Sequence, residues 1–241
     1  MYLRPVHTET YVPTLRALIK QVQLGVLITA IPSANASVIQ TSHIPWTLHV
    51  EDESSDTEYG ILRGHMAKPN PQAKVLADNA QQEQDWQAEQ EVMVLFTGDE
   101  HYISPQHYTE TKPKTGKVVP TWNYSSVAAY GKARIYHSSN PDTPAFLQAQ
   151  MDQLTDQSES RETYLPGNWK VSDAPERYVE LLKKAVIGVE IRITRLEGKF
   201  KMNQESTEGD RRGVVEGLAK AGESGKRVAE MVRERGEKRD P

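Results

Sequence analysis

The sequence contains no cysteine. This absence excludes disulfide bonds, thiolate nucleophiles and cysteine-based zinc sites, and it fits a reducing, cytoplasmic setting. Lysine and arginine number 29 against 33 aspartates and glutamates, so the net charge is −4 and the isoelectric point is near 6.0. Because proteins that coat nucleic acid present a basic surface, we expect weak or no direct binding to DNA.

Long apolar runs are also missing. The apolar stretch at residues 24–31 is interrupted by Gly25 and Thr29 and is too short to span a bilayer. The first seven residues do not resemble an export signal. We therefore expect a cytoplasmic protein that does not enter a membrane.

Standard catalytic motifs are absent as well. The sequence has no glycine-rich dinucleotide loop, no Walker loop, no Gly-x-Ser-x-Gly elbow and no His-Glu-x-x-His helix. The seven histidines lie within the first 137 residues without the spacing of metal ligands, so we expect no metal site. No residue can be assigned a catalytic role from the sequence.

Short apolar segments dominate what is present. They predict strands within residues 24–31, 38–50, 59–67, 92–97, 118–136 (with a break at 123–126) and 187–194. Amphipathic spacing predicts helices over residues 13–22, 71–80, 143–155 and 176–186. Strand–helix–strand alternation is missing, so we expect a mainly β, α+β fold: an antiparallel barrel with peripheral helices.

The C-terminal region differs in character. Residues 208–241 contain no aromatic residue and mix both charges around two weak helical patterns. We expect a domain over residues 1–203 and a charged helical tail over 204–241 that is loosely packed or partly disordered. Its basic residues are nearly neutralised by interleaved glutamates. They are Arg227, Arg233, Arg235, Lys238 and Arg239.

Segment 63–71 is the clearest candidate binding site. Arg63 and His65 share one strand face, and Lys68 lies where the strand gives way to a helix. Cations beside a helix N-terminus suit a phosphate, because guanidinium and free N–H groups both bind its oxygens. Gly64 would let a ligand approach the backbone closely. An edge strand with outward-facing charges explains the same residues without a ligand.

Two further groups suit a planar ring. Thr41, Ser42 and His43 could bond the ribityl chain or ring edge of a flavin, although a polar solvent face explains them equally well. Trp122 and Asn123 combine a flat apolar surface with an amide that both donates and accepts hydrogen bonds. Trp122 also fits a plain core position.

Seven segments stand in order over nearly the whole chain: MYLRP at 1–5, LRGHMAKPNPQ at 62–72, YISP at 102–105, KVVPTWNY at 117–124, VSDAP at 171–175, TRLEGK at 194–199, and residues 210–217. Together they resemble the PaiB-type family of FMN-binding negative transcriptional regulators. The acidic segment 51–58 and the glutamine-rich segment 81–90 look extended relative to the family, and neither touches a motif.

The resemblance implies an FMN-binding split β-barrel related to pyridoxamine-phosphate oxidases, antiparallel with Greek-key connections, that holds FMN between the subunits of a homodimer. It implies cofactor contacts from three places in the sequence. These are the phosphate site of Arg63, Gly64, His65, Lys68 and Asn70; the ring-lining Thr41, Ser42 and His43; and Trp122, Asn123, Lys201 and Gln204, which approach from elsewhere, including the partner subunit.

We therefore expect a flavin-dependent oxidoreductase acting on an unidentified small molecule, with FMN performing the redox chemistry and a nicotinamide nucleotide as a candidate reductant. The alternative is a flavin-binding, repressor-type regulator that acts through other partners, since the sequence has no helix-turn-helix motif. Haem binding by the same type of barrel is a third interpretation that no residue here favours.

Overall fold

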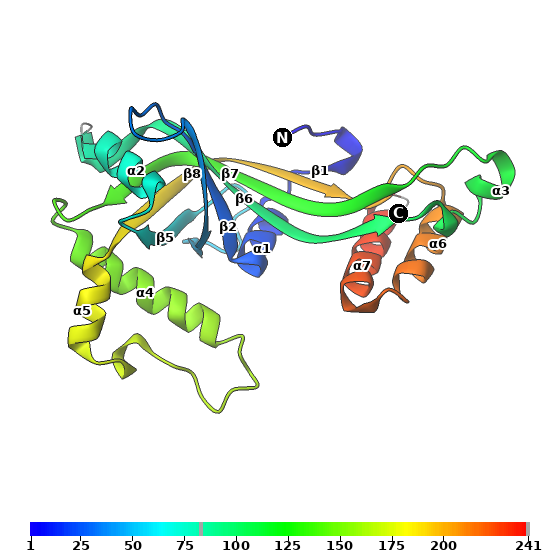
Figure 1. Cartoon of the computed structure of the whole chain (residues 1–241). Helices are drawn as coiled ribbons and strands as arrows, with labels where there is room; N and C mark the ends of the chain where they lie inside the picture. The colour runs from blue at the N-terminus through cyan, green and yellow to red at the C-terminus, as the bar shows by residue number, and fades with distance from the viewer. Residues whose placement is uncertain (82–83, 240–241) are drawn as a thin grey trace. The chain divides into compact units, whose positions relative to one another are not determined.

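The computed structural model describes residues 1–81 and 84–239 (Figure 1). The chain forms two compact units. The barrel unit comprises residues 12–96 and 128–196, and the terminal unit comprises residues 1–11, 97–127 and 197–241. Three long strands contribute residues to both units: β6 (Gln87–Ile103), β7 (Thr121–Tyr136) and β8 (Val186–Lys201).

The barrel unit is built on a curled antiparallel sheet. Its other strands are β2 (Leu24–Ala30), β3 (Ile39–Pro45), β4 (Thr47–His49) and β5 (Ile61–Ala67). The strand order β3-β2-β6-β7-β8-β5-β4 places β3 and β4 at opposite edges, although one residue separates them in the chain. The sheet therefore curls until its edges meet, which confirms the predicted split barrel with peripheral helices.

Trp46 is the residue at which the two edges meet. Its side chain is buried, and its backbone N–H donates to the carbonyl oxygen of Gln23 at 2.8 Å. Opposite it on β5, a Cβ added to Gly64 would lie 3.0 Å from both Ile44 Cγ2 and Trp46 Cε3. A side chain at position 64 would press on both residues, so the glycine lets the edges pack closely.

This closure changes the predicted strand over residues 38–50. We expected one strand here, whereas these residues form two, β3 and β4. The reason is that the chain leaves β3 at Trp46 and joins the opposite edge as β4. The break expected within residues 118–136 is also absent, because β7 runs without interruption from Thr121 to Tyr136.

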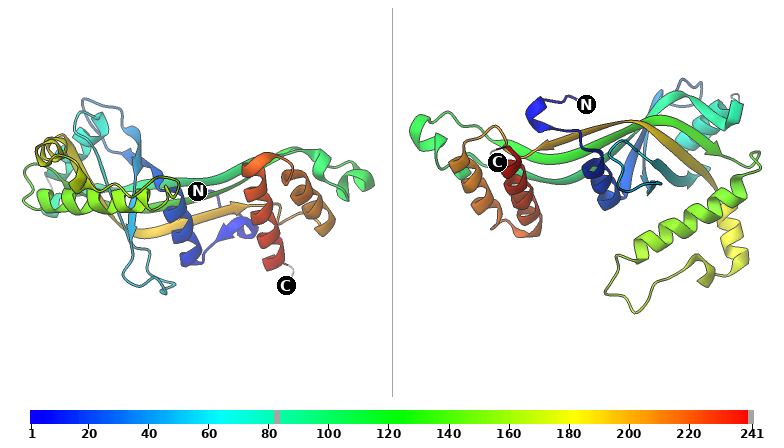
Figure 2. Two further views of the ribbon diagram at one scale, coloured as in Figure 1. Left: turned by 90° about the horizontal axis from the view of Figure 1, so that it is seen from below. Right: turned by 180° about the vertical axis from the view of Figure 1, so that it is seen from behind.

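Helices cover the barrel unit (Figures 1 and 2). They are α1 (Val12–Val22), α2 (Pro71–Gln81), α4 (Thr143–Glu159) and α5 (Glu176–Lys184), with the short helices η2 (Gln84–Trp86) and η4 (Val171–Asp173). Phe146 of α4 stacks on Tyr136 of β7 with ring centroids 3.7 Å apart. No helix in the described part of the chain is both long and apolar enough to cross a membrane.

The acidic segment 51–58 is held by a buried cation. Arg16 of α1 is 2% exposed, and its guanidinium donates to the carbonyl oxygens of Glu53 and Ser55 at 2.8 Å and of Glu58 at 2.9 Å. Backbone carbonyls and a charged donor make strong hydrogen bonds when both are removed from water. The backbone of this loop is therefore anchored to α1, although its carboxylates lie at the surface.

The terminal unit packs two helices on the ends of the long strands. It contains η1 (Pro5–His7), β1 (Thr8–Glu9), η3 (Pro105–His107), α3 (Thr111–Thr115), α6 (Glu208–Leu218) and α7 (Gly222–Arg239). β1 pairs antiparallel with β8, and α6 and α7 lie side by side in all views (Figures 1 and 2). The core comprises Ile103, Tyr108, Met202, Val214, Leu218, Val228, Ala229 and Val232.

The expected helical tail is thus present, but it packs tightly rather than loosely. Val214, Leu218, Val228 and Val232 are all fully buried. A Cβ added to Gly213 would lie 2.1 Å from the carbonyl oxygen of His107, so α6 approaches η3 at backbone contact. A few apolar residues in α6 and α7 are enough for tight packing, because they share a core with residues at the ends of the strands.

Substituting Gly64 tests the barrel closure. Gly64→Ala should lower the free energy of unfolding by about 1–3 kcal/mol, because the added methyl overpacks Ile44 and Trp46. Urea denaturation followed by circular dichroism measures the change. Gly167→Ala is the control, since no atom lies within 4 Å of its Cβ position, and it should change stability by less than about 0.5 kcal/mol. Equal stability of the two variants would show that the edges are not closely packed.

Candidate functional site

Thr41, Ser42 and His43 do not share one face of β3. Thr41 and His43 are exposed, whereas Ser42 alternates with them and lies on the side of the buried Ile44. Successive side chains of a strand point to opposite faces, so these three residues cannot act on one ligand from the same side. The structure brings Ser42, and not its neighbours, to the start of α2.

Three of the predicted residues, Ser42, Lys68 and Asn70, lie at the start of α2 or just before it in the chain. Asn70 caps the helix: its Oδ1 accepts from the backbone N–H of Gln72 at 2.9 Å, and its Nδ2 donates to Ser42 Oγ at 2.9 Å. Lys68, two residues earlier, donates from Nζ to the carbonyl oxygen of Lys184 at 2.6 Å. The amide of Asn70 and the hydroxyl of Ser42 therefore lie at a helix N-terminus, where the helix dipole favours an anion, and Lys68 precedes that terminus in the chain.

Arg63 is engaged with a carboxylate. Its Nε donates to Glu190 Oε2 at 2.8 Å, and the two side chains are 25% and 18% exposed. Tyr136 also donates to Glu190, at 3.3 Å. Burial, followed by the negative charge of Glu190, raises the pKa of Tyr136 to about 12. The charge of Arg63 is thus largely balanced within the barrel unit.

His65 lies under α4. Its Nδ1 is 2.6 Å from Oε1 of Gln150, a fully buried residue of that helix. Gly64, between Arg63 and His65, faces the other side of β5, where Ile44 and Trp46 fill the space expected for a ligand. The strand face of Arg63 and His65 is therefore occupied by the protein's own side chains.

The sequence did not indicate Glu190 or Gln150 as partners of the predicted site. Arg63 and Glu190 are directly opposite in the pairing of β5 with β8, across 127 positions of the chain. Gln150 lies within a predicted helix, but the face that it presents to β5 depends on how α4 packs. The only available signal was that a charged residue stands among the alternating apolar residues of β8.

The predicted residues of the terminal unit point in two directions. Trp122 is 52% exposed, and its ring packs edge-on against Tyr102 with centroids 6.0 Å apart. Asn123, next in β7, is fully buried on the opposite face, where its Nδ2 donates to Asn203 Oδ1 at 2.7 Å. Asn123 therefore supports the fold of the terminal unit and does not reach the surface beside Trp122.

Lys201 and Gln204 also differ in whether a ligand can reach their side chains. Lys201 Nζ donates to Thr121 Oγ1 at 2.8 Å and to the carbonyl oxygen of Trp122 at 2.7 Å, so its ammonium is held at the backbone of Trp122. Gln204 is 5% exposed, and its side chain bonds the backbone of Met202 and Phe200. Of these four residues, Trp122 and Lys201 are the two that a ligand can reach.

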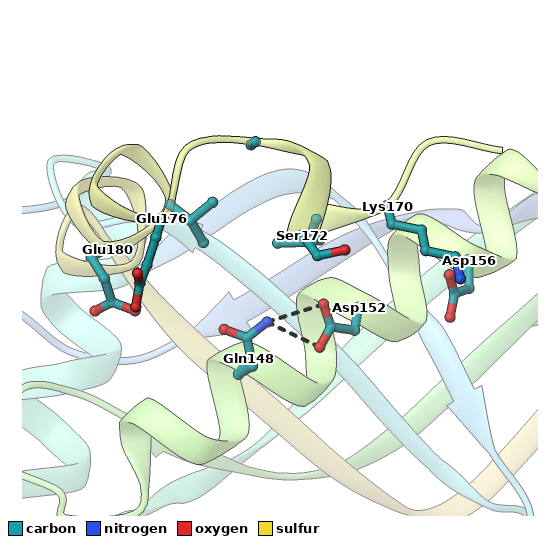
Figure 3. Close-up of a pocket in the computed structure, with 10 residues that line it drawn as sticks. Gln148, Asp152, Asp156, Lys170, Ser172, Glu176 and Glu180 are labelled. Atoms are coloured by element: carbon teal, nitrogen blue, oxygen red, sulfur yellow. Dashed lines mark hydrogen bonds between the residues drawn. The ribbon is translucent and has the colours of Figure 1, made fainter.

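A separate cavity of about 580 Å³ lies between α4 and the segment that leads into α5 (Figure 3). Gln148 donates to both carboxylate oxygens of Asp152 at 3.0 Å. The charged residues of its lining are Asp152, Asp156, Glu176, Glu180 and Lys170. Four carboxylates against one ammonium repel a phosphate, and none of the predicted cofactor residues lines this cavity.

Comparisons with known proteins agree with the sequence resemblance. A family model described as "Putative FMN-binding domain" matches residues 1–195. The chain is 52% identical to an uncharacterized protein of Emericella nidulans, with 100% of this chain and 99% of the relative covered. It is 24% identical to the protease synthase and sporulation protein PAI 2 of Bacillus subtilis, with 80% of each covered.

A solved structure shares the fold. The crystal structure of a conserved hypothetical protein from Mycobacterium tuberculosis matches with a TM-score of 0.50 and 11% identity, covering 86% of this chain and 95% of that one. A likeness at this identity concerns the fold alone. Together with the family match, it confirms the resemblance derived from the sequence motifs.

The environment of Tyr136 predicts a pH dependence of stability. A tyrosine ionises near pH 10 in the unfolded chain, whereas Tyr136 keeps its proton up to about pH 12 in the folded chain. Its contribution to stability is therefore complete below pH 10 and is lost as the pH rises towards 12. In that window the free energy of unfolding should fall by about 1.4 kcal/mol per pH unit from this residue.

Tyr136→Phe should remove that component, and urea denaturation at several pH values between 10 and 12 measures it. Tyr178→Phe, which alters a tyrosine that is 56% exposed on α5, is the control and should keep the wild-type slope. An unchanged slope in Tyr136→Phe would mean that Tyr136 ionises as it does in the unfolded chain.

Proposed function

Because this chain belongs to the FMN-binding domain family, we propose that it is a flavoprotein oxidoreductase that exchanges electrons between FMN and a small molecule. FMN supplies the redox chemistry when it is bound. The protein's own residues bind the cofactor, orient its ring and set its electrostatic surroundings.

The observation that carries the proposal is the hydrogen-bonded pair of Ser42 and Asn70 beside Lys68 at the start of α2. FMN ends in a phosphate dianion, which needs several donors in one place. The ammonium of Lys68 has three N–H groups, and its bond to a carbonyl uses one of them. The positive end of the α2 dipole adds to this set, so the residues present fit the phosphate.

We assign Arg63 and His65 a secondary place in this site. The carboxylate of Glu190 offsets the charge of Arg63 although it takes only one of its five N–H groups, and Gln150 takes one ring nitrogen of His65. Thr41 and His43 are exposed on the other face of β3 from Ser42. They are free to contact a different part of the cofactor, as the sequence resemblance implies for the ring.

We propose that the flavin ring meets the terminal unit of a second copy of the chain. Trp122 offers a flat exposed surface, and the ammonium of Lys201 bonds the backbone carbonyl of the same residue. Aromatic side chains stack well on planar heterocycles, and a lysine can donate to ring oxygens. In this arrangement Asn123 and Gln204 are positioning residues, because they hold the backbone on either side of Trp122 and Lys201 from the buried face.

Affinity for FMN and for riboflavin, which lacks the phosphate, tests the assignment. Lys68→Ala should weaken FMN binding by roughly 10- to 150-fold, the value of one charge-assisted hydrogen bond. Riboflavin binding should be almost unchanged. Flavin fluorescence quenching measures both affinities.

Lys74→Ala is the matched control, since Lys74 is an exposed lysine of α2, six residues after Lys68 in the chain. Arg63→Ala should affect FMN less than Lys68→Ala does. If Arg63→Ala instead causes the larger loss, or if riboflavin binding falls in parallel with FMN, the phosphate does not lie at the start of α2.

A further inference from the structure

One face of the sheet in the terminal unit is covered and the other is open. On the covered face, Ile103 belongs to the core with α6 and α7, and the ring of Phe200 lies 4.2 Å from the guanidinium of Arg235. Side chains alternate along each strand, so the neighbours of these residues point the other way. The open face therefore carries Tyr102, Trp122, Tyr124, Lys199 and Lys201, joined by Tyr2 from the N-terminal segment.

We call these six residues the aromatic face. Tyr2, Trp122 and Tyr102 are 76%, 52% and 43% exposed. A single exposed apolar residue is ordinary, but rings gathered on adjacent strands mark a binding surface. The face is larger than one ring requires, because Trp122 and Tyr124 are alternate residues of β7 and thus lie about 7 Å apart along it.

A cation lies between two of the rings. The Nζ atom of Lys199 is 5.6 Å from the centroid of Tyr2 and 5.3 Å from that of Tyr124. No carboxylate pairs with Lys199 or Lys201 in the described ranges 1–81 and 84–239. The nearby carboxylates have other partners: Glu197 pairs with the N-terminal amine at 2.6 Å, and Glu205 with His7 at 2.9 Å.

The charges at this end of the sheet therefore favour an anion. Burial lowers the pKa of Lys201, and the positive charges of Lys199 and Arg4 lower it further against the opposing effect of Glu205. A ring that packs on tyrosine and an anionic group that reaches Lys199 would satisfy both features at once. Proteins bind nucleic-acid bases by stacking them on aromatic side chains beside positive charge, and the same chemistry suits a nucleotide.

We propose that Tyr2, Tyr124 and Lys199 bind a nicotinamide nucleotide, with its ring against the tyrosines and its phosphate on Lys199. The identification of this ligand as the electron donor rests on the proposed function, because a donor must reach the flavin and Trp122 is the neighbouring ring. A nucleic acid strand fits less well. The chain carries a net charge of −4, and two unpaired ammonium groups release few counterions.

The test titrates the FMN-loaded full chain with oxidised nicotinamide mononucleotide, followed by calorimetry. Tyr2→Ala and Tyr124→Ala should each weaken binding by about 5-fold or more, the usual effect of losing one stacked ring. Tyr164→Ala is the matched control, because Tyr164 is 80% exposed in the barrel unit, close to the 76% of Tyr2. It should bind as the wild type does.

Lys199→Gln distinguishes the contribution of the phosphate to binding from that of the nicotinamide ring. It should weaken binding of the mononucleotide and leave binding of free nicotinamide unchanged, whereas Lys226→Gln on α7 should alter neither. Ribose 5-phosphate, which has no aromatic ring, should bind more weakly than the mononucleotide.

Three results would overturn the proposal. The first is no saturable binding of the mononucleotide, which leaves the proposed function standing if FMN still binds. The second is release of FMN during the titration, which would make the aromatic face part of the flavin site alone. The third is tighter binding of a single-stranded oligonucleotide than of the mononucleotide. If the chain does not bind FMN, the same titration of flavin-free protein still decides the nucleotide site.

Discussion

The contact between Trp46 and Gly64 is the constraint on which the barrel unit depends. It joins the two edges of the sheet, because β3 and β4 lie at opposite ends of the strand order and are linked in the chain by Trp46 alone. Once the edges meet, β3 lies beside β5 and the start of α2. The bond between Ser42 and Asn70 spans this junction. The candidate phosphate site is therefore a product of barrel closure.

Closure also sorts the residues of β5 by face. The position of Gly64 faces Trp46, so the side chains of Arg63 and His65 point to the opposite face of β5. There Arg63 bonds Glu190 and His65 bonds Gln150 of α4. Strand alternation thus separates residues that are adjacent in the sequence. The same rule divides Trp122 from Asn123 in the terminal unit, where one side chain is exposed and the other fully buried.

Local sequence patterns predicted the elements of the fold well. The helix expected at residues 13–22 is α1 at Val12–Val22, and the strand expected at 59–67 contains β5 at Ile61–Ala67. In these segments the alternation of apolar and polar residues can be read within a few positions, and burial of one face of the helix or strand requires that alternation. The motif 63–71 also pointed to the correct junction of strand and helix, since Asn70 caps α2.

The remaining features depend on contacts between distant segments. Pro45, which cannot donate to a ladder, marks an edge or a bulge just before Thr47, but the edge that the chain joins next depends on the strand order. Nothing near Arg63 shows that Glu190 lies opposite. The packing of α6 and α7 was missed because four buried aliphatic residues gain their partners from Ile103, Tyr108 and Met202 elsewhere in the chain. The assignment of each cofactor residue still rests on the proposed function.

A subunit-mixing measurement tests most directly whether one FMN is held by the barrel unit of one copy and the terminal unit of another. Asn70→Ala impairs the first half of such a site and Trp122→Ala the second. Each variant alone should bind FMN poorly. If the site is shared, mixing the two and allowing subunits to exchange creates mixed dimers with one intact site, so tight FMN binding returns to part of the population. If tight binding does not return although mixed dimers form, each chain holds FMN by itself and the shared site is contradicted.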